Sequence, residues 1–206
     1  MIKTIFFDFG GVLIKNPKRK QIHRWKKILG LEGNSELLTM LESPNESTII
    51  RDICLGVLPE EKIWELMAES WHLNPGIIQK IRQMMKSRRH LNKPMLRFLE
   101  ECQNYYQTAI LSNAGDQTRR LMEDVYHLDR YVEEIIISAE EGVIKPDPEI
   151  YRIALRRLSA TAETSLLIDD TKANIDAARE FGMKAIHYKN HRLAIEEIRQ
   201  LLIKEG

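Results

Sequence analysis

The stretch KTIFFDFGGVLI, residues 3–14, constrains the fold of this chain more than any other segment. A short apolar run reaches a single acid, Asp8, and two glycines, Gly10 and Gly11, follow closely. Such a run is typical of a buried parallel strand whose last side chain faces a crevice. The glycines allow a sharp turn and close approach to a ligand. The segment therefore predicts a strand that delivers one carboxylate to a crevice, with a turn or capping role for Asp8 as the alternative.

The remainder of the chain divides into a helical part and an alternating part. From about residue 107, strands are predicted at 107–113, 133–138, 164–169 and 183–188, and helices at 116–127, 148–158, 172–181 and 192–203. Such alternation indicates parallel pairing through right-handed crossovers. Before it, helices are predicted at 18–29, 35–42, 47–54, 60–72, 76–86 and 93–104. We therefore predict an α/β fold, with a parallel core from residues 1–14 and 91–206 and a helical cap, residues 15–90, inserted after the first strand.

Composition excludes several classes of partner. Lys and Arg number 31 against 30 Asp and Glu, a net charge of +1, so no overall field attracts nucleic acid or an anionic membrane. Cys54 and Cys102 lack metal-site spacing, which suits two buried thiols in a reducing compartment. Asp8 interrupts the apolar N-terminus, which favours neither a signal peptide nor a membrane span. We expect a cytoplasmic protein, either a monomer or a homodimer.

Polar residues lie at or after the end of each of the first four predicted core strands. Asp8 ends the first strand, Ser112 and Asn113 end the second, Lys145 follows the third, and Asp169 and Asp170 end the fourth. In an open parallel sheet, ligands bind at the carboxyl ends of strands, so these groups are expected to share one crevice. Adjacent carboxylates repel each other unless a cation intervenes, and hard oxygen ligands suit Mg²⁺. Helix capping by the aspartates and the serine is the alternative.

Four segments carry a family resemblance. FFDFGGVL, AILSNA, GVIKPDPEIY and LLIDDTKANIDAAREFGM occur in this order and resemble the four motifs of the haloacid dehalogenase-like hydrolase superfamily. The resemblance implies a Rossmann-like core, an aspartate nucleophile and, in most members, Mg²⁺-dependent phosphate hydrolysis. The helical insertion resembles the small cap of members that act on soluble substrates.

The resemblance also implies roles for the acids and the lysine. Asp8 would attack phosphorus to give an aspartyl phosphate, which water then hydrolyses, and Lys145 would neutralise the nucleophile and the transferring phosphoryl group. Asp8, the backbone carbonyl of Gly10 and Asp170 would bind the metal. Asp169 would hold a metal-bound water or orient Lys145.

Three further positions follow from the same motifs. Ser112, Asn113 and the backbone near Gly11 would bind the phosphate of the substrate. Asn174, one helical turn beyond Asp170, would buttress the loop of Asp169 and Asp170, which we call the acidic loop.

The chain departs from the family pattern at Gly10. Phosphatases of this family usually carry there a second aspartate, which protonates the leaving alcohol, and general acid–base catalysis contributes roughly 10²–10⁴ in rate. Three hypotheses remain: a phosphatase of a small phosphate ester such as a sugar phosphate, a 2-haloacid dehalogenase whose halide leaves without a proton, and a phosphate-binding regulatory module. Asp169 and Asp170 favour the first, because dehalogenation needs no Mg²⁺.

Overall fold

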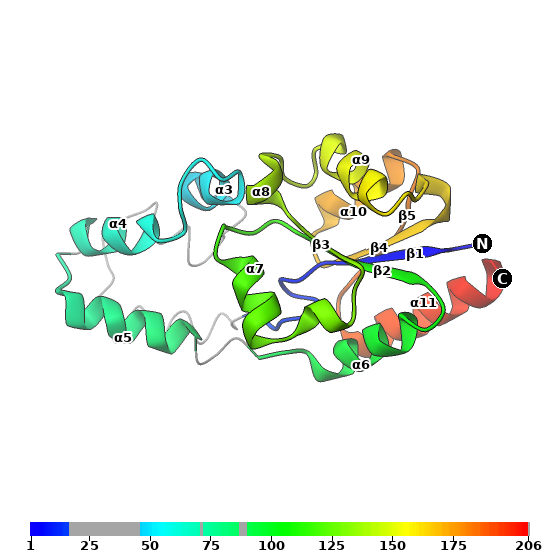
Figure 1. Cartoon of the computed structure of the whole chain (residues 1–206), viewed down its shortest axis with the longest axis horizontal. Coiled ribbons are helices and arrows are strands. Elements are labelled where there is room, and N and C mark those ends of the chain that lie inside the picture. Colours follow the sequence, from blue (N-terminus) through cyan, green and yellow to red (C-terminus); the bar gives the residue numbers. More distant parts are fainter. Residues whose placement is uncertain (17–45, 71, 87–89, 206) are drawn as a thin grey trace.

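The computed structural model describes residues 1–16, 46–70, 72–86 and 90–205, and its centre is a five-stranded parallel sheet (Figure 1). The strands are β1 (Thr4–Phe7), β2 (Gln107–Ser112), β3 (Glu134–Ile137), β4 (Ser165–Asp169) and β5 (Lys184–His187). Their spatial order is β3-β2-β1-β4-β5, with every pair parallel. The predicted α/β class with a Rossmann-like parallel sheet is confirmed.

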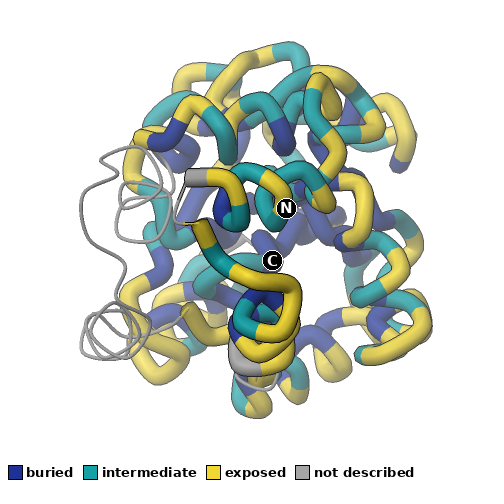
Figure 2. Tube along the Cα trace, turned by 90° about the vertical axis from the view of Figure 1, so that its left-hand side faces the viewer, coloured by how far each residue is buried: buried dark blue, intermediate teal, exposed yellow. Residues whose placement is uncertain are grey.

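Both faces of the sheet are covered by helices, which is why the strands are apolar throughout. In β1, Ile5 and Phe7 belong to one buried cluster and Phe6 to another. The helices α6 (Lys93–Cys102) and α11 (His191–Glu205) contribute to the first cluster, and α9 (Pro148–Arg157) and α10 (Lys172–Glu180) to the second. Figure 2 shows buried segments inside and exposed segments around the outside.

Most predicted elements lie within a few residues of their predicted bounds. This holds for α3 (Thr48–Cys54), α4 (Lys62–Ser70) and α5 (Pro75–Lys86) as well as for the helices of the sheet layers. The helix predicted at 116–127 is instead a short helix α7 (Thr118–Arg120) that continues as a π-helical turn, Leu121–Val125. One short helix, α8 (Ser138–Glu141), follows β3 directly and was not predicted. The helices predicted at 18–29 and 35–42 lie outside the described residues.

The helices α4 and α5 form a pair at the end of the molecule toward which the strands' carboxyl ends point (Figure 1). Buried Met67, Ile78 and Ile81 lie between them. At the base of the insertion the chain leaves and re-enters the core side by side, because Ile14 bridges Leu91. The assignment of residues 15–90 as a separate cap stays a prediction. None of the helices in the described ranges is long and apolar enough to span a bilayer.

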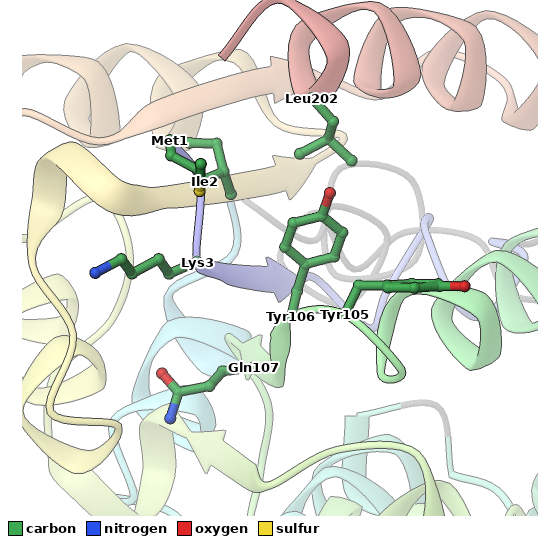
Figure 3. A pocket seen from close by; sticks show the side chains of 7 residues that line it. All are labelled: Met1, Ile2, Lys3, Tyr105, Tyr106, Gln107 and Leu202. Atoms are coloured by element: carbon green, nitrogen blue, oxygen red, sulfur yellow. The ribbon is translucent and has the colours of Figure 1, made fainter. Parts of the chain in front are cut away.

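A shallow pocket of about 490 Å³ opens at the amino ends of β1 and β2 (Figure 3). Its lining consists of Met1, Ile2, Lys3, Tyr105, Tyr106, Gln107 and Leu202. This lining holds no carboxylate, and it lies at the opposite end of the strands from Asp8. The predicted site residues are therefore not part of this pocket.

Candidate active site

Three carboxylates meet where β1 and β4 end. Asp8 follows β1, and its N–H donates to the Ile168 carbonyl at 2.9 Å, which places it beside the end of β4. Asp169 is the last residue of β4, and Asp170 follows it. Asp8, Asp169 and Asp170 each offer one oxygen within 4.8 Å of the other two. The structure therefore brings together the three acids that the strand-end pattern placed at one crevice.

Lys145 joins this cluster from the loop between α8 and α9. Its buried ammonium donates to Asp8 Oδ1 at 3.0 Å and to Asp169 Oδ2 at 2.6 Å. A third hydrogen bond, 2.7 Å long, goes to the Leu111 carbonyl. Burial lowers the pKa of Lys145, but the carboxylates of Asp169 and Asp8 outweigh it, so the pKa lies above its usual value. Lys145 is thus a fully hydrogen-bonded cation in the interior.

The two adjacent acids have different surroundings. Asp169 is fully buried, and besides Lys145 it accepts hydrogen bonds from the Thr171 N–H at 2.7 Å and from Asn174 Nδ2 at 3.1 and 3.0 Å. Asp170 is only partly buried, and its side-chain contacts are longer, 3.3 Å from Asn16 Nδ2 and 3.4 Å from the Thr171 hydroxyl. The carboxylate of Asp169 is therefore occupied by hydrogen bonds from protein donors, whereas that of Asp170 makes only longer hydrogen bonds.

The charges of this cluster are balanced only in part. The pKa of Asp8 is raised to about 7, chiefly by burial and also by the carboxylates of Asp169 and Asp170, against the opposing charge of Lys145. The pKa of Asp170 is also raised, by burial and by Asp169. One lysine thus faces three acids, and a divalent cation between them would favour their charged forms. Mg²⁺ prefers oxygen ligands of this kind, so the donor set fits that ion.

The double glycine after Asp8 has two distinct structural roles. Gly11 has a φ of +79°, and a Cβ there would lie 1.9 Å from Asp170 Oδ2, so any other residue would be strained and would displace the Asp170 side chain. A Cβ at Gly10 would meet nothing within 4 Å. Gly11 is therefore required for the approach of Asp170, whereas position 10 has room for a side chain.

Replacing Gly11 with Ala should displace Asp170 and weaken the binding of Mg²⁺ to the three acids. Because changes around a metal site typically cost 10–100-fold in affinity, we expect the affinity for Mg²⁺ to fall by roughly 10–100-fold. Isothermal titration with Mg²⁺ measures this loss. Gly182→Ala is the control, since Gly182 also has a positive φ, +100°, but a Cβ there would only touch Ala162 at 3.5 Å. Equal losses in both variants would attribute the effect to backbone strain instead.

The two predicted phosphate-binding residues after β2 have different environments. Ser112 is buried at the end of β2, and no side-chain hydrogen bond between described residues involves it. The amide of Asn113 instead makes two hydrogen bonds to the backbone of Lys145, each 2.8 Å long. The assignment of Ser112, Asn113 and Gly11 to phosphate binding stays a prediction.

Two contacts of the acidic loop were not foreseen from the sequence. Asn16 reaches Asp170 from the segment that leaves the first motif. A ring nitrogen of His187 lies 3.0 Å from the backbone oxygen of Asp170. These partners are separated by 154 and 17 positions in the sequence, and no local spacing signals such pairs.

The segment that contains α3 packs against α8 and against the loop that follows β2. Gly56 has a φ of +71°, and a Cβ there would lie 2.3 Å from the Ala139 carbonyl oxygen. A Cβ on Gly115 would lie 2.7 Å from Ile53 Cγ2. The Glu60 N–H also donates to Asp116 Oδ1 at 2.9 Å. Residues 53–60 therefore lie directly on the loop that follows β2.

Several known proteins are similar in sequence to this chain. A model of the haloacid dehalogenase-like hydrolases matches residues 5–188. Bifunctional epoxide hydrolase 2 of Mus musculus is 30% identical over 133 residues, which are 62% of this chain and 24% of that protein, so the match spans about a quarter of its length. D-ribitol-5-phosphate phosphatase of Bacteroides thetaiotaomicron is 20% identical over 196 residues, 92% of this chain and 93% of that protein.

A crystal structure supports the same assignment of the fold. It is that of a wild-type enzyme of this family from Bacteroides thetaiotaomicron, in complex with magnesium and inorganic phosphate. The TM-score is 0.76 at 22% identity, and the alignment covers 92% of this chain and 95% of that one.

Proposed function

This chain belongs to the haloacid dehalogenase-like hydrolase family, and on that premise we propose that it is a Mg²⁺-dependent phosphatase acting on a small soluble phosphate ester. One observation carries the proposal: buried Lys145 joins Asp8 to Asp169, while Asp170 lies beside Asp8 with weaker protein partners. This arrangement supports the proposal, because it would supply a nucleophile, a fixed cation and an oxygen-rich place for a metal at one end of the strands. Two relatives that are described as phosphatases match this chain over most of their length, and they support the same activity.

Asp8 is the nucleophile of the proposed reaction. One of its oxygens attacks phosphorus, the bond from phosphorus to the ester oxygen breaks, and the leaving group departs with that electron pair. Water then attacks the phosphorus of the aspartyl phosphate, which releases inorganic phosphate and restores Asp8. Lys145 holds Asp8 in place and offsets negative charge as the phosphoryl group approaches.

The two adjacent acids, Asp169 and Asp170, would have different roles in metal binding. Asp8, Asp170 and the Gly10 carbonyl would hold Mg²⁺, which when bound neutralises charge on the phosphoryl oxygens. Asp169 holds the Lys145 ammonium in place. Asn174 in turn donates to both carboxylate oxygens of Asp169. Ser112 and the backbone near Gly11 would contact the phosphate.

The substrate is expected to have a leaving group that needs little proton transfer. Gly10 supplies no acid, so a sugar 1-phosphate or an acyl phosphate suits the site better than an ordinary alkyl phosphate. A sugar phosphate also agrees with the relatives described as phosphatases of D-ribitol-5-phosphate and of phosphorylated carbohydrates. Residues 15–90 would act as a cap that excludes bulk water during turnover. We propose a cytoplasmic monomer or homodimer with neither a nucleic-acid nor a membrane partner.

Gly10 favours a second candidate, a 2-haloacid dehalogenase. In that reaction Asp8 would attack carbon and form an ester, and halide would leave without needing a proton. The close approach of Asp8, Asp169 and Asp170 argues against a dehalogenase, because that reaction needs no metal ion. A phosphate-binding module with weak turnover is the third candidate.

A panel of phosphorylated metabolites, assayed for phosphate release with Mg²⁺ and with EDTA, tests the proposal. We expect turnover of at least one sugar phosphate, with loss of activity in EDTA. A parallel assay measures halide release from L-2-chloropropionate. Metal-independent halide release would replace the proposal with the dehalogenase, and no release in either assay would replace it with the binding module.

A further inference from the structure

The side chain of Asn113 is bonded to a single residue, Lys145, at two points. Asn113 Nδ2 donates to the Lys145 carbonyl at 2.8 Å, and the Lys145 N–H donates to Asn113 Oδ1 at 2.8 Å. Both lengths are those of normal hydrogen bonds. The Lys145 ammonium in turn donates to the carbonyl of Leu111, two residues before Asn113. Residues 111–113 therefore hold Lys145 at both its backbone and its charged end.

From this geometry we infer that Asn113 is a positioning residue, whose side chain sets Lys145 against Asp8 and Asp169 and does not bind the phosphate of the substrate. The inference rests on the proposed function, because it assigns the role of Lys145 in that reaction. It replaces the phosphate-binding role that the motif suggested for Asn113.

The position of Lys145 in the chain explains why such a contact is needed. A lysine side chain is a flexible four-carbon stem, so its ammonium is placed only as well as its backbone is held. Lys145 lies in the loop between α8 and α9, outside any strand ladder. Its ammonium must nevertheless reach both Asp8 and Asp169. Buried backbone groups also require partners, and Asn113 supplies one for the N–H and one for the carbonyl of Lys145.

Amide hydrogen exchange tests the contact without reference to activity. In Asn113→Ala, exchange of the Lys145 N–H, followed by NMR, should accelerate by roughly tenfold, the loss expected for one intramolecular hydrogen bond. Asn104→Ala is the matched control, because Asn104, just after α6, also donates to backbone carbonyls, but to those of Glu100 and Glu101, and its loss should leave exchange at Lys145 unchanged. Unchanged exchange at Lys145 in Asn113→Ala would overturn the inference.

A double-mutant cycle tests whether the contact acts through Lys145. With p-nitrophenyl phosphate and Mg²⁺, Asn113→Ala should lower kcat by roughly 10²-fold, the cost of misplacing a catalytic group by about 1 Å, and should leave KM nearly unchanged. In a Lys145→Met background the same substitution should change kcat by less than about threefold. Additive losses, or a raised KM with kcat retained, would instead assign Asn113 to substrate binding and overturn the inference.

A second variant keeps the test decisive if Asn113→Ala does not fold. Asn113→Asp has nearly the same shape and still accepts from the Lys145 N–H, but it cannot donate to the carbonyl. We expect retained protection of that N–H and a kcat lowered by roughly tenfold. Unchanged kcat would overturn the positioning role. If the wild-type protein hydrolyses no phosphate ester, the proposed function fails, and the exchange experiment still decides whether Asn113 holds Lys145.

Discussion

Replacing Asp8 with Asn is expected to abolish turnover of every phosphate ester, with kcat lowered by roughly 10⁴-fold or more. A carboxamide has nearly the same shape but is not a nucleophile toward phosphorus, and it supplies no charge to Lys145. The measurement is phosphate release by wild-type and variant protein at saturating Mg²⁺. Retained protein-bound phosphate after acid quenching should be found only with the wild type.

The same substitution should not destabilise the metal-free protein. Asp8 is buried close to two other acids, and burial together with their charges opposes its ionisation, so Asn removes a repulsive charge. Lys145 keeps its hydrogen bonds to Asp169 and to the Leu111 carbonyl. Thermal unfolding in EDTA should therefore give a Tm for Asp8→Asn equal to or above that of the wild type.

Asp176→Asn is the control for this experiment. Asp176 lies on α10 with a half-exposed side chain that pairs with the exposed Lys172, and its loss should leave both kcat and Tm nearly unchanged. Activity of Asp8→Asn within tenfold of the wild type would contradict the role of Asp8 as nucleophile. A lost fold in EDTA would instead mean that Asp8 is needed for structure.

Replacing Gly10 with Asp should raise activity on alkyl phosphates by up to roughly 10²–10⁴-fold. The new carboxylic acid can protonate the leaving alcohol, which no group at this position does in the natural chain. A Cβ at position 10 meets nothing within 4 Å, so the backbone there accepts a side chain without a clash at its first atom. The gain should be largest for poor leaving groups and small for p-nitrophenyl phosphate, because nitrophenolate leaves without needing a proton.

Gly10→Asn separates proton transfer from simple filling of space. It has the size of the aspartate but no acidic proton, so we expect no gain on alkyl phosphates. The measurement is kcat/KM across phosphate esters whose leaving groups differ in pKa, and the slope of the logarithmic plot should flatten only in Gly10→Asp. If neither variant gains activity and both are folded, another group already supplies the proton.

The sheet and the meeting of its acids could be predicted because both depend on local patterns. An apolar run of strand length and a following helix can be recognised within a few residues, as at 164–169 and 172–181. Parallel strands place their carboxyl ends at one edge, so Asp8, Asp169 and Asp170 had to lie near one another. The helix predicted at 116–127 was less accurate, since this segment continues from α7 into a π-helical turn that no local pattern had indicated.

Sequence alone thus determined the parallel α/β core and the set of residues at the carboxyl ends of its strands. Strand length, helix period and turn glycines can each be recognised from residues close together in the sequence. Only the tertiary structure decided which of those residues bond to one another. Asp169 accepts from Lys145 and Asn174, Asp170 is left with weaker contacts, and Asn113 bonds to the backbone of Lys145. The physical reason is distance along the chain. Asn113 and Lys145 are 32 positions apart, and Asn16 and Asp170 are 154 apart, so these hydrogen bonds form only when the sheet brings their segments together.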